Sequence, residues 1–221
     1  MLIREVMRHS MFHKAAFVVL VASLALSAQN GAPNKDAPNL PPRATPADYQ
    51  AQAKVGMVTI AAEFAAHSLP TPEGPLTTED YVVVETCLFG PPGAKLTLSP
   101  GDFSLRVNGK KTPIPSQPYG LVLKSLKDPY WVPPEDPEAK GSKTMIGQSA
   151  EKDPSVLPHV VHMPIELQRA MEKKAQRASM PEGERPLPTA GLLFFEHRGK
   201  VNSVELVYTG PAGKATLPLQ P

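Results

Sequence analysis

The stretch Tyr81–Phe89, with the sequence YVVVETCLF, indicates the fold class of this chain of 221 residues. Most of its residues are β-branched or aromatic, and such residues favour strands. Side chains of a strand alternate between two faces, and one face here carries Val82, Val84, Thr86 and Leu88. The opposite face includes Glu85, and charged strand faces normally contact water. We therefore expect a strand with one face in the core and one wet face, on which Glu85 forms a surface salt bridge.

Further segments with short runs of apolar and β-branched residues lie on both sides of this strand. They are 54–64, 95–98, 103–107, 191–197, 204–208 and 214–219. Glycine and proline turns separate them, and the pair Asn108-Gly109 suits the tight turn of a hairpin into residues 110–114. Short strands at close spacing predict an all-β protein, an antiparallel β-sandwich.

The order of four motifs resembles a known family. They are Tyr81–Glu85 (YVVVE), Ser99–Leu105 (SPGDFSL), Gly191–Phe195 (GLLFF) and Leu206–Tyr208 (LVY). In this order they resemble the telokin-like immunoglobulin domain of exported bacterial proteins, over residues 55–219. The resemblance implies an immunoglobulin-like sandwich with a role in binding at the cell envelope. It assigns no site, because the motif residues are core and turn residues.

Residues 119–189 are longer than that family core requires, so we interpret them as a loop and helix insertion. Most of the insertion is rich in proline and turn residues, which predicts a surface excursion outside the sheets. Residues 164–179 are an exception: strong helix formers follow Pro164, and Pro181 ends the run. The predicted helix has a thin apolar stripe, formed by Leu167, Met171, Ala175 and Ala178.

Residues 1–28 have the pattern of a cleavable signal peptide. Three basic residues precede the apolar run Ala15–Ala28, which is shorter than a membrane-spanning helix requires. The expected location is therefore periplasmic or extracellular, without stable membrane insertion after cleavage. Residues 29–52 are rich in proline, alanine and asparagine, and we expect a flexible tether there.

The net charge limits the classes of partner that can be expected, and the cysteine count excludes an internal disulfide. Cleavage after residue 28 would remove three basic residues and one acidic residue, which leaves 20 of each and a formal charge of zero. This balance gives no electrostatic argument for binding to nucleic acid or anionic lipid. Cys87 is the only cysteine, so the domain has no internal disulfide.

The sequence contains no recognisable catalytic machinery. Nucleophile-elbow, phosphate-loop and paired-cysteine patterns are absent, so we predict that the chain is not an enzyme and uses no cofactor. The pair His159 and His162 is the one pattern that suggests a metal, with His67 and His197 as further candidates. Prolines bracket the pair, so solvated loop histidines are the simpler interpretation, and no metal site is predicted.

A partner-binding site is predicted in the insertion, at Tyr130, Trp131, Pro133 and Pro134. Exposed aromatics beside prolines offer a large contact area at a small cost in entropy. The alternative is that the aromatic pair folds back on its own domain and covers the sheet edge or the outward face near Val83 and Phe89.

These patterns favour a non-enzymatic binding or structural module whose partner is another protein of the envelope. Two alternatives remain open: a metal-dependent hydrolase-type enzyme that uses the insertion histidines, and an assembly subunit that pairs through edge strands.

Overall fold

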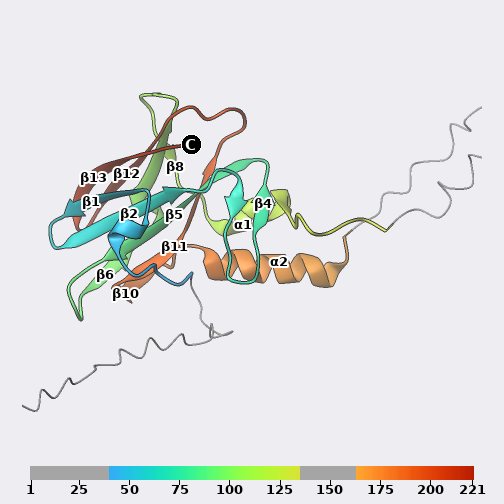
Figure 1. Cartoon of the computed structure of the whole chain (residues 1–221), viewed down its shortest axis with the longest axis horizontal. Coiled ribbons are helices and arrows are strands. Elements are labelled where there is room, and N and C mark those ends of the chain that lie inside the picture. The colour runs from blue at the N-terminus through green and yellow to red at the C-terminus, as the bar shows by residue number, and fades with distance from the viewer. Residues whose placement is uncertain (1–39, 135–162) are drawn as a thin grey trace, which may run out of the picture. The chain divides into compact units, whose positions relative to one another are not determined.

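The structure, a computed structural model, describes residues 40–134 and 163–221. Two four-stranded antiparallel sheets dominate it (Figure 1). The first sheet has the spatial order β1 (Ala51–Val55), β2 (Val58–Phe64), β5 (Tyr81–Phe89) and β11 (Thr189–Glu196). The second has the order β13 (Gly213–Leu219), β12 (Val204–Gly210), β7 (Phe103–Val107) and β8 (Ile114–Pro115). The predicted all-β sandwich is thus confirmed.

The main core lies between these two sheets. The first sheet contributes the even-numbered side chains of β5, among them Val82, Val84 and Leu88, which are fully buried. The second sheet contributes large aromatic side chains, of which Phe103 and Tyr208 lie with their ring centroids 5.0 Å apart. The predicted alternation of β5 is therefore confirmed on its inner face.

The outer face of the first sheet is also covered, so the expectation of a wet face is wrong. The covering elements are β3 (Ser68–Leu69), β4 (Leu76–Thr78), β9 (Leu126–Lys127), α1 (Tyr119–Val122) and α2 (Ile165–Ala178). Val83, Leu192 and Phe194 of the sheet share an apolar cluster with Met171 and Ala175 of α2. Glu85 lies on this outer face and is only 7% exposed.

The expected tether at 29–52 is wrong for residues 40–52, the part that the structure describes. This part includes the 3₁₀ helix Pro46–Asp48 and the start of β1 at Ala51. Leu40 and Tyr49 are buried in apolar clusters on the sheet. We call residues 40–50 the N-terminal strap. The expected signal peptide, and residues 29–39 of the expected tether, lie outside the described residues.

The segment expected as one strand at 54–64 contains a turn. Val55 pairs with Val58, so Gly56 and Met57 form a two-residue hairpin turn between β1 and β2. Gly56 has a φ of 60°, which glycine adopts without steric cost. The valines on both sides mask this turn in the sequence.

The turn at Asn108-Gly109 forms as predicted, with φ values of 54° and 69°. Residues 110–113, expected to continue the hairpin, do not pair with β7, because β8 begins only at Ile114, opposite Leu105. Asn108 instead ties its loop to residues 200–203. Its amide donates to the Lys200 carbonyl at 2.9 Å, and its oxygen accepts from the Asn202 nitrogen at 2.7 Å.

The predicted helix is confirmed as α2, and its buried side chains are Met171, Ala175 and Ala178. Residues 119–126 and α2 from Met171 onward pack on the first sheet rather than lying outside the fold. Residues 135–162 lie outside the described residues. After α2 the chain runs beside β11, where the Met180 nitrogen donates to the Leu192 carbonyl at 2.9 Å. Gly191 permits this approach, since a Cβ there would lie 2.6 Å from the same nitrogen.

The remaining regular elements are short. β6 (Lys95–Leu98) has the bounds predicted for a strand at 95–98, and it pairs with β10 (Gly183–Pro186), which was not predicted. Two further 3₁₀ helices span Pro100–Asp102 and Leu123–Ser125. Within the described residues, no helix has the length and apolar character needed to cross a membrane.

Candidate functional site

The predicted partner-binding residues follow β9, in a segment shaped by Asp128. The Asp128 carboxylate accepts from the Tyr130 nitrogen at 2.9 Å, and its carbonyl accepts from the Trp131 nitrogen at 3.1 Å. This turn leaves the Tyr130 side chain 76% exposed, while Trp131 is half-buried. Pro133 and Pro134 are exposed and extend the segment away from the sheets.

The alternative position for this aromatic pair, over Val83 and Phe89, is already occupied. Val83 is buried in the cluster that includes side chains of α2. The Phe89 ring meets Tyr49 of the N-terminal strap edge-on, with centroids 6.0 Å apart. The exposed Tyr130 therefore covers neither residue.

A groove of about 550 Å³ opens beside this segment. One wall is the stretch from Leu123 to Leu126, and the other is the first half of α2. Its apolar lining consists of Leu123, Leu126, Met163, Ile165 and Met171. Its polar lining consists of Lys124, Gln168, Arg169 and Glu172.

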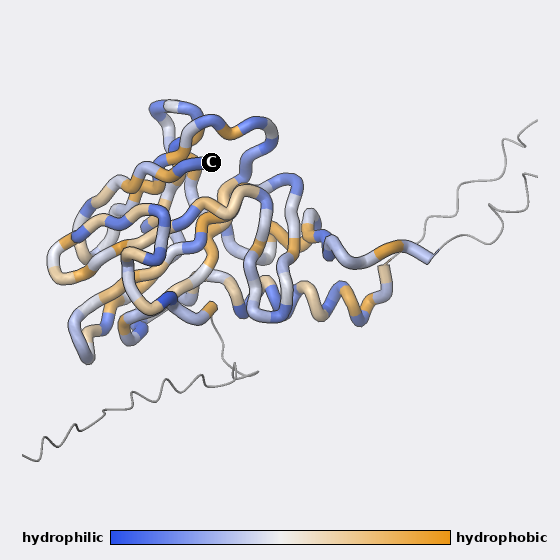
Figure 2. The backbone as a smooth tube through the Cα atoms, in the orientation of Figure 1, coloured by the Kyte–Doolittle hydropathy of each residue, from blue (hydrophilic) through white to orange (hydrophobic). Residues whose placement is uncertain are grey.

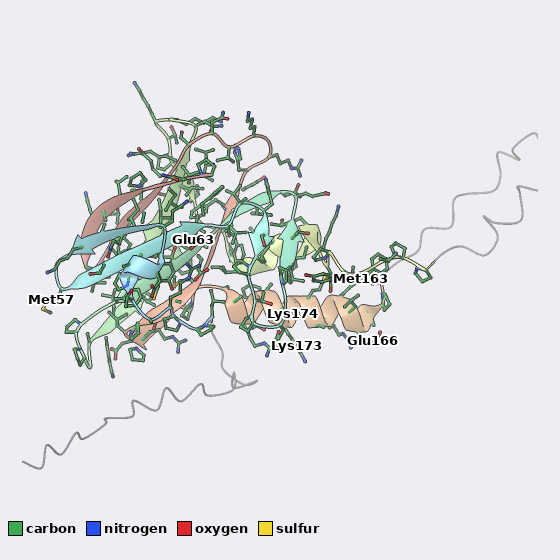
Figure 3. The ribbon with its side chains drawn as sticks, in the orientation of Figure 1. Met57, Glu63, Met163, Glu166, Lys173 and Lys174 are labelled. Atoms are coloured by element: carbon green, nitrogen blue, oxygen red, sulfur yellow. The ribbon has the colours of Figure 1, made fainter. Side chains whose placement is uncertain are left out.

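The groove exists because α2 packs against the rest of the domain with only part of its length. The buried residues of the helix begin only at Met171, the seventh of its 14 residues, and continue with Ala175 and Ala178. The N-terminal half projects away from the sheets, as Figure 1 shows. Ile165, in the first turn, is 56% exposed. Figure 3 shows Met163 next to this turn, where the chain approaches the helix.

Exposed apolar side chains gather around the same end of the molecule. Five large hydrophobic side chains in the described parts of the chain are strongly exposed, and four of them belong to elements at this end: Leu121 in α1, Tyr130 and Val132 after β9, and Ile165 in the first turn of α2. The fifth, Met57, lies in the β1–β2 turn at the far end of the sheets (Figure 3). Figure 2 shows hydrophobic stretches along the strands between these two ends. We call these four residues, together with Trp131, the apolar face.

Leu121, Val132 and Ile165 were not among the residues predicted for this site. Val132 directly follows the predicted Trp131 and is 78% exposed, more than either aromatic neighbour. Ile165 had a detectable signal, because it lies off the apolar stripe of the predicted helix. A β-branched apolar residue off the buried stripe has no core to enter and must face solvent or a partner.

The candidate metal ligands are not assembled into a site in the described residues. The His67 ring contacts the Tyr81 carbonyl through Nδ1 at 2.8 Å, and the His197 backbone nitrogen donates to the Asp80 carbonyl at 2.9 Å. Both histidines thus meet the backbone at the start of β5, but no group of three metal-ligating side chains forms in 40–134 and 163–221. His159 and His162 lie outside these ranges.

A cluster of charged side chains connects the N-terminal strap to the first sheet. The Arg43 guanidinium donates to both Glu85 oxygens, from Nε at 3.2 Å and Nη2 at 3.0 Å, and also pairs with Glu63. Its carbon lies 4.6 Å from the centroid of the Tyr49 ring. The expected surface salt bridge of Glu85 is therefore a largely buried one, made by a residue 42 positions away.

This cluster is built for structure rather than proton transfer. Both oxygens of Glu85 accept from Arg43, which leaves neither free to act as a general base. Burial raises the pKa of the Cys87 thiol to about 12, although the hydrogen-bonded Tyr49 hydroxyl lowers it. Burial likewise raises the pKa of Tyr49. Cys87 is therefore protonated at neutral pH and is a poor nucleophile.

Comparison of the chain with known protein families, with curated proteins and with solved structures gave no match.

Proposed function

We propose that this chain is an exported, non-enzymatic binding module of the cell envelope that captures another protein through its apolar face. The observation that carries the proposal is that four of the five strongly exposed large hydrophobic side chains in the described residues belong to elements at one end of the domain: Leu121, Tyr130, Val132 and Ile165. Clustered exposed apolar side chains mark interaction sites in soluble proteins, whereas scattered ones need no explanation.

The composition of the apolar face suits a protein partner. Aromatic side chains such as Tyr130 and Trp131 are enriched among the residues that dominate binding energy. The turn at Asp128 fixes the backbone at both aromatic residues, so less conformational entropy is lost when a partner binds. Lys124 and Arg169 at the groove supply a polar rim of the kind that surrounds interface cores.

Export to the periplasm or the extracellular space is part of the proposal. It is supported by the sequence of residues 1–28, with its basic start, its apolar run and its small residues near Ala28. In that compartment a domain without a disulfide depends on its core. The apolar clusters on both faces of the first sheet fit this requirement.

We also propose that the domain is immunoglobulin-like and related to the telokin-like family. The strand order supports this, because β5 lies between β2 and β11 while β12 lies between β7 and β13. An immunoglobulin sandwich places its strands B and F in this way, each inside its own sheet.

Enzymatic activity is the first rival. The acid–base and nucleophile candidates on β5, Glu85 and Cys87, are occupied or protonated, which weighs against catalysis at that cluster. A metal-dependent hydrolase that uses His159 and His162 is tested by metal analysis of the purified full chain. Stoichiometric zinc or copper would overturn the non-enzymatic proposal.

Assembly through edge strands is the second rival. Proline interrupts the donors of several edges, at Pro115 of β8, Pro186 of β10 and Pro218 of β13. The free edge of β11 is partly occupied, since the Gln117 nitrogen donates to the Phe194 carbonyl at 2.7 Å. These features disfavour pairing, and a concentration-dependent dimer in size-exclusion chromatography would restore this rival.

The test of the proposed function compares two single-site variants of the tagged full chain. Val132→Asp places a charge in the apolar face, whereas Met57→Asp does the same at an equally exposed site on the far end. Capture from an envelope extract should yield a protein that the wild type and Met57→Asp retain and Val132→Asp loses. Equal capture by all three chains would refute the proposal.

A further inference from the structure

We propose that the groove between α2 and residues 123–126 is a binding site for a small amphipathic anion, a single alkyl chain that ends in a carboxylate. The groove shares Ile165 with the apolar face, but this proposal does not depend on the partner protein proposed above.

The size and lining of the groove suit a small ligand. Its volume of about 550 Å³ lies in the range of small-molecule sites, roughly 300–1,000 Å³. Leu123, Leu126 and Met171 form an apolar floor, of which Leu126 and Met171 belong to the cluster under the sheet. Met163 and Met171 add flexible thioether side chains, which adapt to irregular ligands. The lining thus combines apolar with polar side chains, which suits an amphipathic ligand.

The charged side chains at the groove favour an anionic headgroup. Lys124 on one wall and Arg169 on the other are exposed cations that form no ion pair with the described residues. Neighbouring cations are different: Lys127 pairs with Glu79, and Arg177 pairs with Glu73 at 2.8 Å.

One carboxylate, Glu172, also lines the groove, so its side chains carry a net charge of +1. Gln168 adds no charge, and its amide donates to the Met163 carbonyl at 2.9 Å. An anionic head in the groove would be attracted by both Lys124 and Arg169, and a hydrogen bond to either cation would be charge-assisted. A cationic head would be repelled by the same two side chains.

The probe for the experiment is dodecanoate, kept below its micelle-forming concentration and titrated calorimetrically into the full chain. Saturable binding with one site per chain is the expected result. Dodecyltrimethylammonium has the same tail and the opposite charge, and it should bind at least tenfold more weakly. Comparable binding of the two surfactants would overturn the assignment of the headgroup.

Two variants test the geometry. Lys124→Gln with Arg169→Gln should weaken dodecanoate binding about five- to tenfold, as expected for two partly exposed ion pairs. Lys173→Gln with Lys174→Gln is the matched control, because it removes two charges on α2 that do not line the groove, and it should leave the affinity unchanged. An equal effect in both pairs would show diffuse electrostatics and overturn the site.

Gln168→Phe fills the groove from an exposed position of α2 and should abolish binding without unfolding the domain, as checked by its melting curve. Unchanged dodecanoate affinity in this variant would overturn the proposal. So would dodecanoate binding seen only after residues 139–158 are replaced by a glycine-serine linker, which would assign the groove to the chain's own segment. Failure of these tests would leave the Val132 capture experiment unaffected, so the two proposals fail separately.

Discussion

Arg43 holds Glu85 in a forked contact, with Nε 3.2 Å and Nη2 3.0 Å from the two carboxylate oxygens. Glu85 lies on the central strand β5, and Arg43 lies in the N-terminal strap that crosses the sheet. Burial lowers the pKa of Arg43, but its hydrogen bonds to Glu63 and Glu85 outweigh this effect and raise the pKa overall. The strap is therefore fixed by a buried charge pair as well as by apolar contacts.

Arg43→Ala is expected to lower the free energy of unfolding by about 2–3 kcal/mol, because it leaves Glu85 buried without a partner. Urea denaturation measures this change, and limited proteolysis should show new cuts in residues 40–50. Lys95→Ala, which breaks the exposed pair with Glu184, is the control and should cost under about 0.5 kcal/mol. A loss in Arg43→Ala as small as in the control would mean that the strap does not depend on this pair.

Gly191→Ala should destabilise the fold by about 2 kcal/mol, since the added Cβ would lie 2.6 Å from the Met180 nitrogen. Gly120→Ala is the matched control in α1, where an added Cβ meets nothing within 4 Å. It should leave stability unchanged or raise it by up to about 1 kcal/mol. Thermal melts of both variants make the comparison, and similar melting temperatures would contradict the close approach of the chain after α2 to β11.

Alkaline pH should weaken the fold through Cys87. Its pKa rises from the ordinary 9.0 to about 12 in the folded state, so above pH 9 the unfolded chain loses a proton that the native chain keeps. The stabilisation is complete below pH 9 and is lost as the pH rises toward 12. Between pH 9 and pH 10 the free energy of unfolding should fall by about 1 kcal/mol.

Cys87→Ala removes this proton and should flatten the decline between pH 9 and pH 10, whatever its effect on absolute stability. Urea titrations at the two pH values measure the slope for each chain. Parallel slopes in the wild type and Cys87→Ala would show that the thiol is not the group responsible.

The strands of the sandwich and the helix α2 follow from local sequence. Strands can be predicted from the alternation of apolar residues and from the turns between them. Tyr81–Phe89 has the same bounds in the structure as in the prediction. The period of two tells which side chains share a face. It does not tell what covers the face, and for Glu85 the answer depends on Arg43, which is 42 residues away.

Other features were hidden because their cause is tertiary. The strap residues 40–50 have the composition of a tether, and they are ordered by the sheet they contact rather than by their own propensities. The two-residue strands β3, β8 and β9 are too short to produce a periodic signal, and they exist because a neighbouring strand offers free hydrogen-bonding groups.

The candidate site was only partly accessible from sequence. Tyr130 and Trp131 were recognisable because large aromatics in a proline-rich segment are conspicuous. The groove was not, because it results from α2 burying Met171, Ala175 and Ala178 while its first turn, with Ile165, projects beyond the sheets. That difference depends on the extent of the sheet beneath the helix, which the sequence of the helix does not encode.

Photo-cross-linking in the native cell tests the central claim most directly, namely that the apolar face is a protein-binding surface. A benzophenone amino acid is placed at Val132 in one chain and at Met57 in another, two positions with exposed fractions of 78% and 80%. We expect a discrete cross-linked protein from position 132 and none from position 57. No cross-link at position 132, or the same products from both positions, would contradict the account.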